Sequence, residues 1–211
     1  MPKRSYKLKD FPRKPLYIRW FAKMKQNTAF IGFAGRLIVA HFLTYFFIGL
    51  LFYVSGLNVI VYYEQHPQAL INALYRDTSS LLVTAGPLFQ LLRGFIFALA
   101  LYPFRTVFLE RKFGWLYLWG IFLALAIFAP ASAAPGSIEG FVYTNLPISF
   151  HLIYLPEIIL QTLAFAWLFV VWEKHPVKKL TIPLVVVFLL ILLINGFPVL
   201  QYLGGLDPNL P

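Results

Sequence analysis

The sequence predicts an all-α integral membrane protein, a bundle of five transmembrane helices with a cytoplasmic amino terminus and an external carboxyl terminus. Three observations lead to this fold class. The 211-residue chain is 60% hydrophobic and only 12% charged, it has five apolar stretches long enough to cross a bilayer, and its basic residues gather on one side of those stretches. Soluble domains of this length do not have such a composition.

The five apolar stretches define the expected spans. A helix rises about 1.5 Å per residue, so about 20 residues cross a hydrocarbon core of about 30 Å. We predict spans at residues 30–57, 81–104, 113–133, 147–172 and 182–203. Residues 28–211 should therefore form one transmembrane bundle, preceded by a basic segment of residues 1–27.

The placement of the basic residues sets the orientation. Fifteen of the 18 Lys and Arg residues lie in residues 1–27, 105–112 and 173–181, which an alternating path places on one side. The positive-inside rule makes that side cytoplasmic. Topology thus accounts for the net charge of +10, and we expect no nucleic-acid partner. We expect the cytoplasmic membrane of a bacterium or archaeon.

Two segments outside the spans have helical patterns of their own. Residues 16–26 repeat apolar side chains at helical spacing, with Arg19 and Lys23 on another face. This pattern favours an interfacial amphipathic helix that contacts anionic lipid headgroups. The alternative is a solvated tail whose charges only orient the chain. Residues 67–75 are expected to form a second, shorter interfacial helix.

Arg93 is the most informative residue, because it lies in the middle of the second apolar stretch. A guanidinium at that depth costs about 2.5–3.5 kcal/mol and is by default a sign of function. Glu157 is the acidic residue within another apolar stretch, so we predict that Arg93 and Glu157 are direct partners.

Further polar residues accompany this pair on four of the five stretches. Since polar side chains avoid lipid, we expect them to converge on a common interior. They are His41, Thr44, Gln90, His151, Gln161 and Asn195. Pro87, Pro156 and Pro198 lie close to these residues and can kink their helices. Residues 134–147 should form a structured turn that roofs this interior and places Glu139 toward it; the alternative is a glutamate that points to water.

Several kinds of chemistry lack their sequence signals. His41, His151, Glu139 and Glu157 have no metal-ligand spacing, so we assign no metal, and the two histidines lie at different depths, which disfavours haem. The chain has no Cys, which excludes thiol chemistry. No nucleotide-binding or hydrolase motif is present, so the sequence assigns neither a cofactor nor a catalytic residue.

Three functions remain open. In the first, the protein binds or helps to translocate a small anionic or protonatable ligand at a polar intramembrane site centred on Arg93 and Glu157. In the second, it is a structural or accessory subunit, with a membrane protein partner, whose buried pair only specifies helix packing. In the third, it is a membrane-embedded enzyme that acts on a lipid-linked substrate, with His151 or a carboxylate as general base.

The predicted topology can be tested by labelling. Because an odd number of spans separates the termini, cysteines that replace Ser5 and Asn209 should react with an impermeant maleimide from opposite sides of the membrane. Labelling of both positions from one side would contradict the topology.

Overall fold

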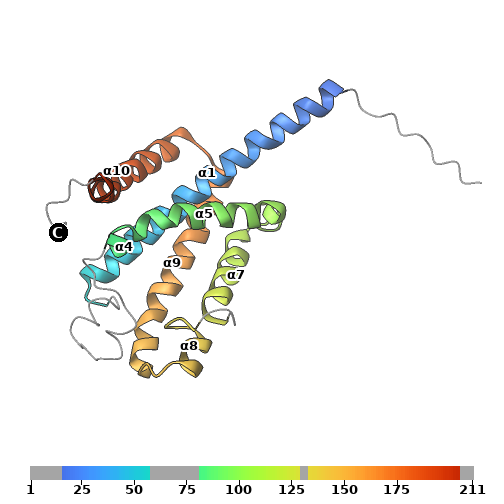
Figure 1. Cartoon of the computed structure of the whole chain (residues 1–211). Helices are drawn as coiled ribbons and strands as arrows, with labels where there is room; N and C mark the ends of the chain where they lie inside the picture. Colours follow the sequence, from blue (N-terminus) through green and yellow to red (C-terminus); the bar gives the residue numbers. More distant parts are fainter. Residues whose placement is uncertain (1–15, 58–80, 129–132, 205–211) are drawn as a thin grey trace, which may run out of the picture. The chain divides into compact units, whose positions relative to one another are not determined.

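The computed structural model describes residues 16–57, 81–128 and 133–204, without the side chains of residues 16–28, 84 and 203. Every regular element in these ranges is a helix. The chain divides into a unit Met1–Gly32 and a unit Phe33–Pro211. Helix α1 (Leu16–Val54) begins in the first unit, and the architecture described below belongs to the second (Figure 1).

Among the described residues, four helices are long and apolar enough to cross a membrane. They are Ala29–Val54 within α1, the helical run Gly86–Leu109, α9 (Ile148–Lys174) and the segment Lys178–Tyr202 of α10 (Lys178–Leu203). The internal prolines Pro156, Pro183 and Pro198 do not end their helices. The described part of the chain is therefore all-helical and contains several candidate membrane-spanning helices.

The third predicted span is only partly described. Helix α7 (Gly114–Phe128) is apolar but has 15 residues, which corresponds to about 22 Å and is less than the core of a bilayer. Residues 129–132, which would extend it, lie outside the described residues, as does the short helix predicted at residues 67–75. The count of five spans, the orientation and the interfacial character of residues 16–26 stay predictions, although residues 16–26 are helical and continuous with the first span.

The second predicted span, residues 81–104, needs a correction. The chain forms α4 (Leu81–Thr84), turns at Ala85, and continues as α5 (Gly86–Leu101), η1 (Tyr102–Phe104) and α6 (Arg105–Leu109). Pro87 lies in the first turn of α5, where proline is well tolerated, so it starts a helix instead of kinking one. Arg105 consequently belongs to the helical run rather than to a connection, and its guanidinium donates to the Tyr102 carbonyl and lies over the Tyr102 ring.

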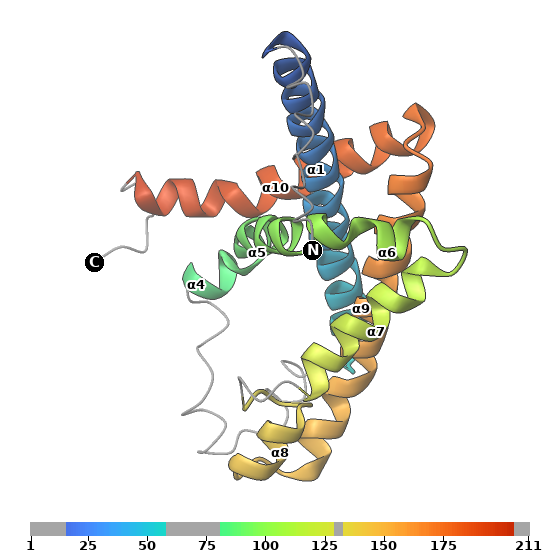
Figure 2. The same ribbon diagram turned by 90° about the vertical axis from the view of Figure 1, so that its right-hand side faces the viewer.

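Helices α7 and α9 pack against each other, and α8 (Ile138–Tyr143) lies at the end of this pair (Figures 1 and 2). The expected structured turn at residues 134–147 thus contains a short helix. Ser137 caps it by accepting a hydrogen bond from the Gly140 N–H at 3.0 Å. Gly136 has a φ of 82°, a conformation that suits glycine.

Aromatic side chains form much of the core between α1, α6, α7 and α9. Phe169 of α9 contacts the rings of Phe33, Phe108 and Phe165. Phe42 on α1 contacts Phe188 of α10. The Phe33–Phe169 and Phe42–Phe188 pairs are edge-to-face. Such geometry makes the packing directional, which matters in a membrane because burial of apolar surface away from lipid gains little free energy.

Gly114 fixes the start of α7 against α6. A Cβ atom at this position would overlap the backbone carbonyl oxygen of Phe108, whereas a Cβ at Gly120, on the same helix, would meet nothing within 4 Å. A backbone atom cannot move aside as a flexible side chain can.

We therefore predict opposite outcomes for two equivalent substitutions. Gly114→Ala should lower the melting temperature in detergent, at a cost of about 1–3 kcal/mol typical of overpacking. Gly120→Ala should leave it unchanged or raise it, because alanine favours a helix over glycine. Equal losses in both variants would contradict the close approach of α6 and α7.

Candidate functional site

One face of α1 carries the residues around which the intramembrane polar groups gather. Ile38, His41, Tyr45 and Gly49 follow one another at intervals of three or four residues, so they form a stripe along the helix. Gly94 of α5 lies directly on this stripe: a Cβ there would be 3.0 Å from the Ile38 Cα atom. A small residue at this crossing lets the two backbones approach closely.

His41 and Gln90 form a buried polar pair beside this crossing. The His41 Nε2 atom lies 3.2 Å from Gln90 Oε1, and because an amide oxygen only accepts, Nε2 carries the proton. The Gln90 amide nitrogen donates back to the Gly86 carbonyl at 3.4 Å. Phe97 and Phe165 each contact the imidazole edge-to-face at 5.2 Å between centroids. The structure thus brings together these two polar residues of the first and second apolar stretches.

Arg93 and Glu157 both lie near Tyr45. Both charges are close enough to interact electrostatically with Tyr45, and Arg93 also interacts with His41. Glu157 Oε1 is 3.9 Å from the position of a Cβ atom on Gly49, so its carboxylate lies against α1. The Glu157 side chain is half-buried, whereas the Arg93 side chain is exposed.

The structure therefore brings four of the predicted site residues to one region, namely His41, Gln90, Arg93 and Glu157. The direct pairing of Arg93 with Glu157 stays a prediction. The sequence analysis missed Tyr45. A tyrosine at helical spacing between His41 and Gly49 could have been noticed, but the chain has 12 tyrosines and this one stands out only through its neighbours.

His151 is engaged elsewhere. Its Nδ1 atom accepts a hydrogen bond from the Gly136 N–H at 3.2 Å, and its Nε2 atom lies 3.5 Å from the Thr144 hydroxyl. Phe141 of α8 contacts its ring. These contacts use both ring nitrogens to hold the α8 loop on α9, and in the described part of the chain they do not bring His151 to Arg93. Its role in the polar site stays a prediction.

The remaining predicted polar residues have other surroundings. The Thr44 hydroxyl donates to the Ala40 carbonyl and the Asn195 amide nitrogen to the Ile191 carbonyl, so each of these hydrogen bonds stays within its own helix. Glu139 lies half-buried in the first turn of α8, and Gln161 is half-buried one turn after Glu157.

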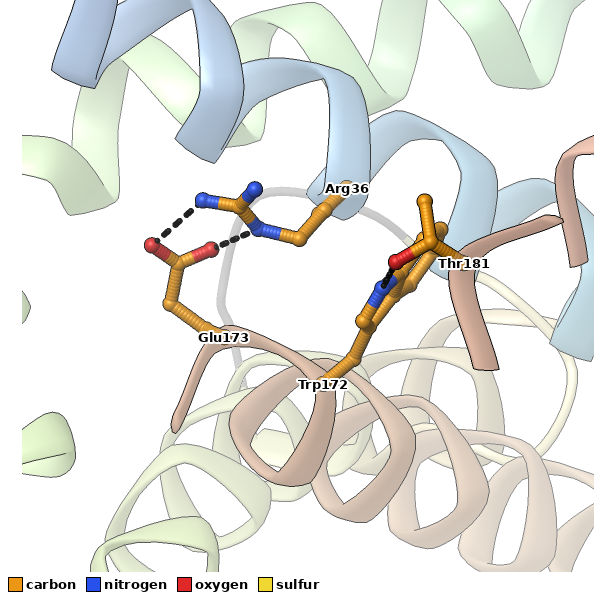
Figure 3. A network of polar contacts seen from close by, with 4 residues as sticks. All are labelled: Arg36, Trp172, Glu173 and Thr181. Atoms are coloured by element: carbon orange, nitrogen blue, oxygen red, sulfur yellow. Dashed lines mark hydrogen bonds and ion pairs between the residues drawn. The ribbon is translucent and has the colours of Figure 1, made fainter. Parts of the chain in front are cut away.

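A second polar cluster lies at the ends of α9 and α10 (Figure 3). Arg36 of α1 donates two hydrogen bonds to Glu173 of α9, from Nε at 2.5 Å and from Nη2 at 2.9 Å. The neighbouring Trp172 indole donates to the Thr181 hydroxyl of α10 at 2.9 Å. Lys174 donates to the Arg111 carbonyl, in the turn before α7. The sequence analysis placed Glu173 in a connection and missed this ion pair, which joins residues 137 positions apart.

No protein-family model matches the chain, and no characterised protein or solved structure shows significant similarity to it. Among the described residues, no three His, Asp or Glu side chains gather in a way that could hold a metal ion. The candidate site is therefore defined by its residues: a buried His–Gln pair, a tyrosine and two opposite charges on apolar helices.

The two-point contact between Arg36 and Glu173 can be tested by a double-mutant cycle. Arg36→Ala and Glu173→Ala should each destabilise the protein in detergent, and the double variant should lose less than the sum, with a coupling of about 0.5–3 kcal/mol. Arg36→Ala combined with Glu110→Ala, at an exposed acid near α7, provides the control and should be additive. Additivity in both pairs would refute the contact.

Proposed function

We propose that the protein binds or helps to translocate a small anionic or protonatable ligand at an intramembrane site centred on Arg93 and Glu157. In this proposal the chain crosses the cytoplasmic membrane five times, with its amino terminus inside. The observation that carries the proposal is an exposed arginine beside a buried polar pair, on a helix long and apolar enough to cross a bilayer.

The depth of Arg93 supports a functional role. Arg93 lies seven residues after the start of α5 at Gly86, which corresponds to about 10 Å along the helix, and 16 residues before Leu109. Insertion of a charged side chain at such a depth costs free energy, so charged residues found there usually have an oppositely charged partner or a function. A purely packing role would favour burial of the guanidinium against an acidic side chain, whereas the Arg93 side chain is exposed.

The surrounding groups suit recognition of an anion. A guanidinium presents a planar set of donors that matches carboxylate and phosphate oxygens. Glu157, which also lies near Tyr45, adds a carboxylate that can exchange a proton with a protonatable ligand. The His41–Gln90 pair is held by its hydrogen bond and by the rings of Phe97 and Phe165, so it gives the site a packed, ordered support.

A second candidate function, an accessory subunit of a membrane complex, is favoured by the surface of α10. Almost none of the apolar part of this helix is buried within the chain. Lipid or a partner helix can cover such a surface, and in that case Arg93 would pair with an acid of the partner.

Thermal stabilisation by anions tests the proposed function. A ligand that binds only the folded state raises the melting temperature in a concentration-dependent way. We expect at least one member of a panel of inorganic phosphate, acetate, alkyl phosphates and alkyl carboxylates to stabilise the wild type in a neutral detergent, and Arg93→Ala to abolish the effect.

Arg105→Ala is the matched control, because Arg105 lies on the same helical run but is stacked on Tyr102. This variant should keep the stabilisation. If no anion stabilises the wild type, or if Arg93→Ala responds as the wild type does, the binding proposal fails and the accessory-subunit function becomes the better explanation.

A further inference from the structure

Helix α5 has two distinct faces, and Arg93 lies on the exposed one. The buried face consists of Gln90, Gly94, Ala98 and Leu101, and Gly94 meets α1. On the other face, Phe89, Leu92, Ile96 and Leu99 are each more than half exposed. Leu92 and Ile96, within one turn of Arg93, are 60% and 53% exposed.

When α5 crosses a bilayer, the side of the helix that carries Phe89, Leu92, Ile96 and Leu99 contacts lipid. Apolar side chains with half or more of their surface exposed gain by contact with acyl chains, and water is scarce at that depth. Arg93 interrupts the face about 10 Å from the start of the helix. An anion that approaches Arg93 from this side must come through the hydrocarbon region.

A small water-soluble anion is poorly suited to such a route. An unpaired ion loses most of its hydration energy in an apolar medium, so it has a low concentration beside α5. An anion with an apolar tail is concentrated in the bilayer, because each buried CH₂ group contributes about 0.8 kcal/mol to its partitioning. Its headgroup then has to move only from the membrane surface to the depth of Arg93.

We infer that the ligand of Arg93 is an amphipathic anion that enters laterally from the bilayer. Its phosphate or carboxylate headgroup binds the guanidinium, and its tail lies along the apolar face formed by Phe89, Leu92 and Ile96. The inference rests on the proposed function, which it narrows from small anions in general to tailed anions. The positive charge amid an exposed apolar stripe is complementary to both parts of such a molecule.

The length of the tail is the variable to test. In a neutral maltoside detergent, the full-length protein should bind dodecyl phosphate at least tenfold more tightly than methyl phosphate, measured by melting-temperature titration. Arg93→Ala should weaken the binding of dodecyl phosphate by about tenfold or more, as expected for loss of a charge-assisted contact. Leu92→Ala together with Ile96→Ala should weaken dodecyl phosphate but not methyl phosphate.

The controls separate this inference from the proposed function. Leu189→Ala, at a residue of α10 that is 47% exposed, should leave both affinities unchanged. If dodecyl phosphate and methyl phosphate bind with equal affinity and both need Arg93, lateral entry of a tailed anion is refuted, but the proposed anion site at Arg93 is supported. Binding of neither would overturn the proposed function as well. Tight binding of dodecyl phosphate to Arg93→Ala would show non-specific insertion of the tail, or an Arg93 that serves a partner's acid, and would also overturn the inference.

Discussion

The arrangement of the intramembrane polar groups depends on one close crossing, that of Gly94 on α5 with Ile38 on α1. The backbones meet there because glycine has no side chain to separate them. Gln90 lies one turn before Gly94 and contacts the His41 side chain. Arg93 is next to Gly94 in the sequence and is close enough to His41 and Tyr45 to interact with them electrostatically. A larger residue at position 94 would move α5 away from α1 and separate these pairs.

Two polar clusters of different character are built on α1. The cluster around Tyr45 contains two opposite charges, one of them the exposed guanidinium of Arg93, and the hydrogen-bonded His41–Gln90 pair. The cluster at the end of α9 joins Arg36 and Glu173 in a two-point contact and ties α10 and the turn before α7 to α9. The second cluster suits a structural role, because the ion pair of Arg36 and Glu173 joins α1 to α9. We propose the first as a binding site, because the Arg93 side chain is exposed.

The sequence predicted the helical class, the membrane-spanning character and the positions of most long helices, because apolar length is a local property. It misplaced the second span, since Gly86 and Pro87 start a helix there and the turn at Tyr102–Phe104 does not end it. It found His41 and Gln90 from their polarity but missed Tyr45, an aromatic residue among many. It could not find the contact of Arg36 with Glu173, because that contact depends on tertiary geometry. It could not find the contact of His151 with the Gly136 N–H either, because almost every residue has a backbone N–H and the sequence does not distinguish this one.

Disulfide formation between α1 and α5 tests the central crossing most directly, because the natural chain has no cysteine. The Cβ position at Gly94 is 3.5 Å from the Ile38 Cβ, within the range of about 3.5–4.5 Å that a disulfide spans. A variant with Ile38→Cys and Gly94→Cys should therefore form an intramolecular disulfide under mild oxidation in membranes. A control with Ile38→Cys and Leu92→Cys, where Leu92 lies on the exposed face, should not. Absence of the disulfide in the first variant, or equal yield in both, would contradict the crossing and the polar site built on it.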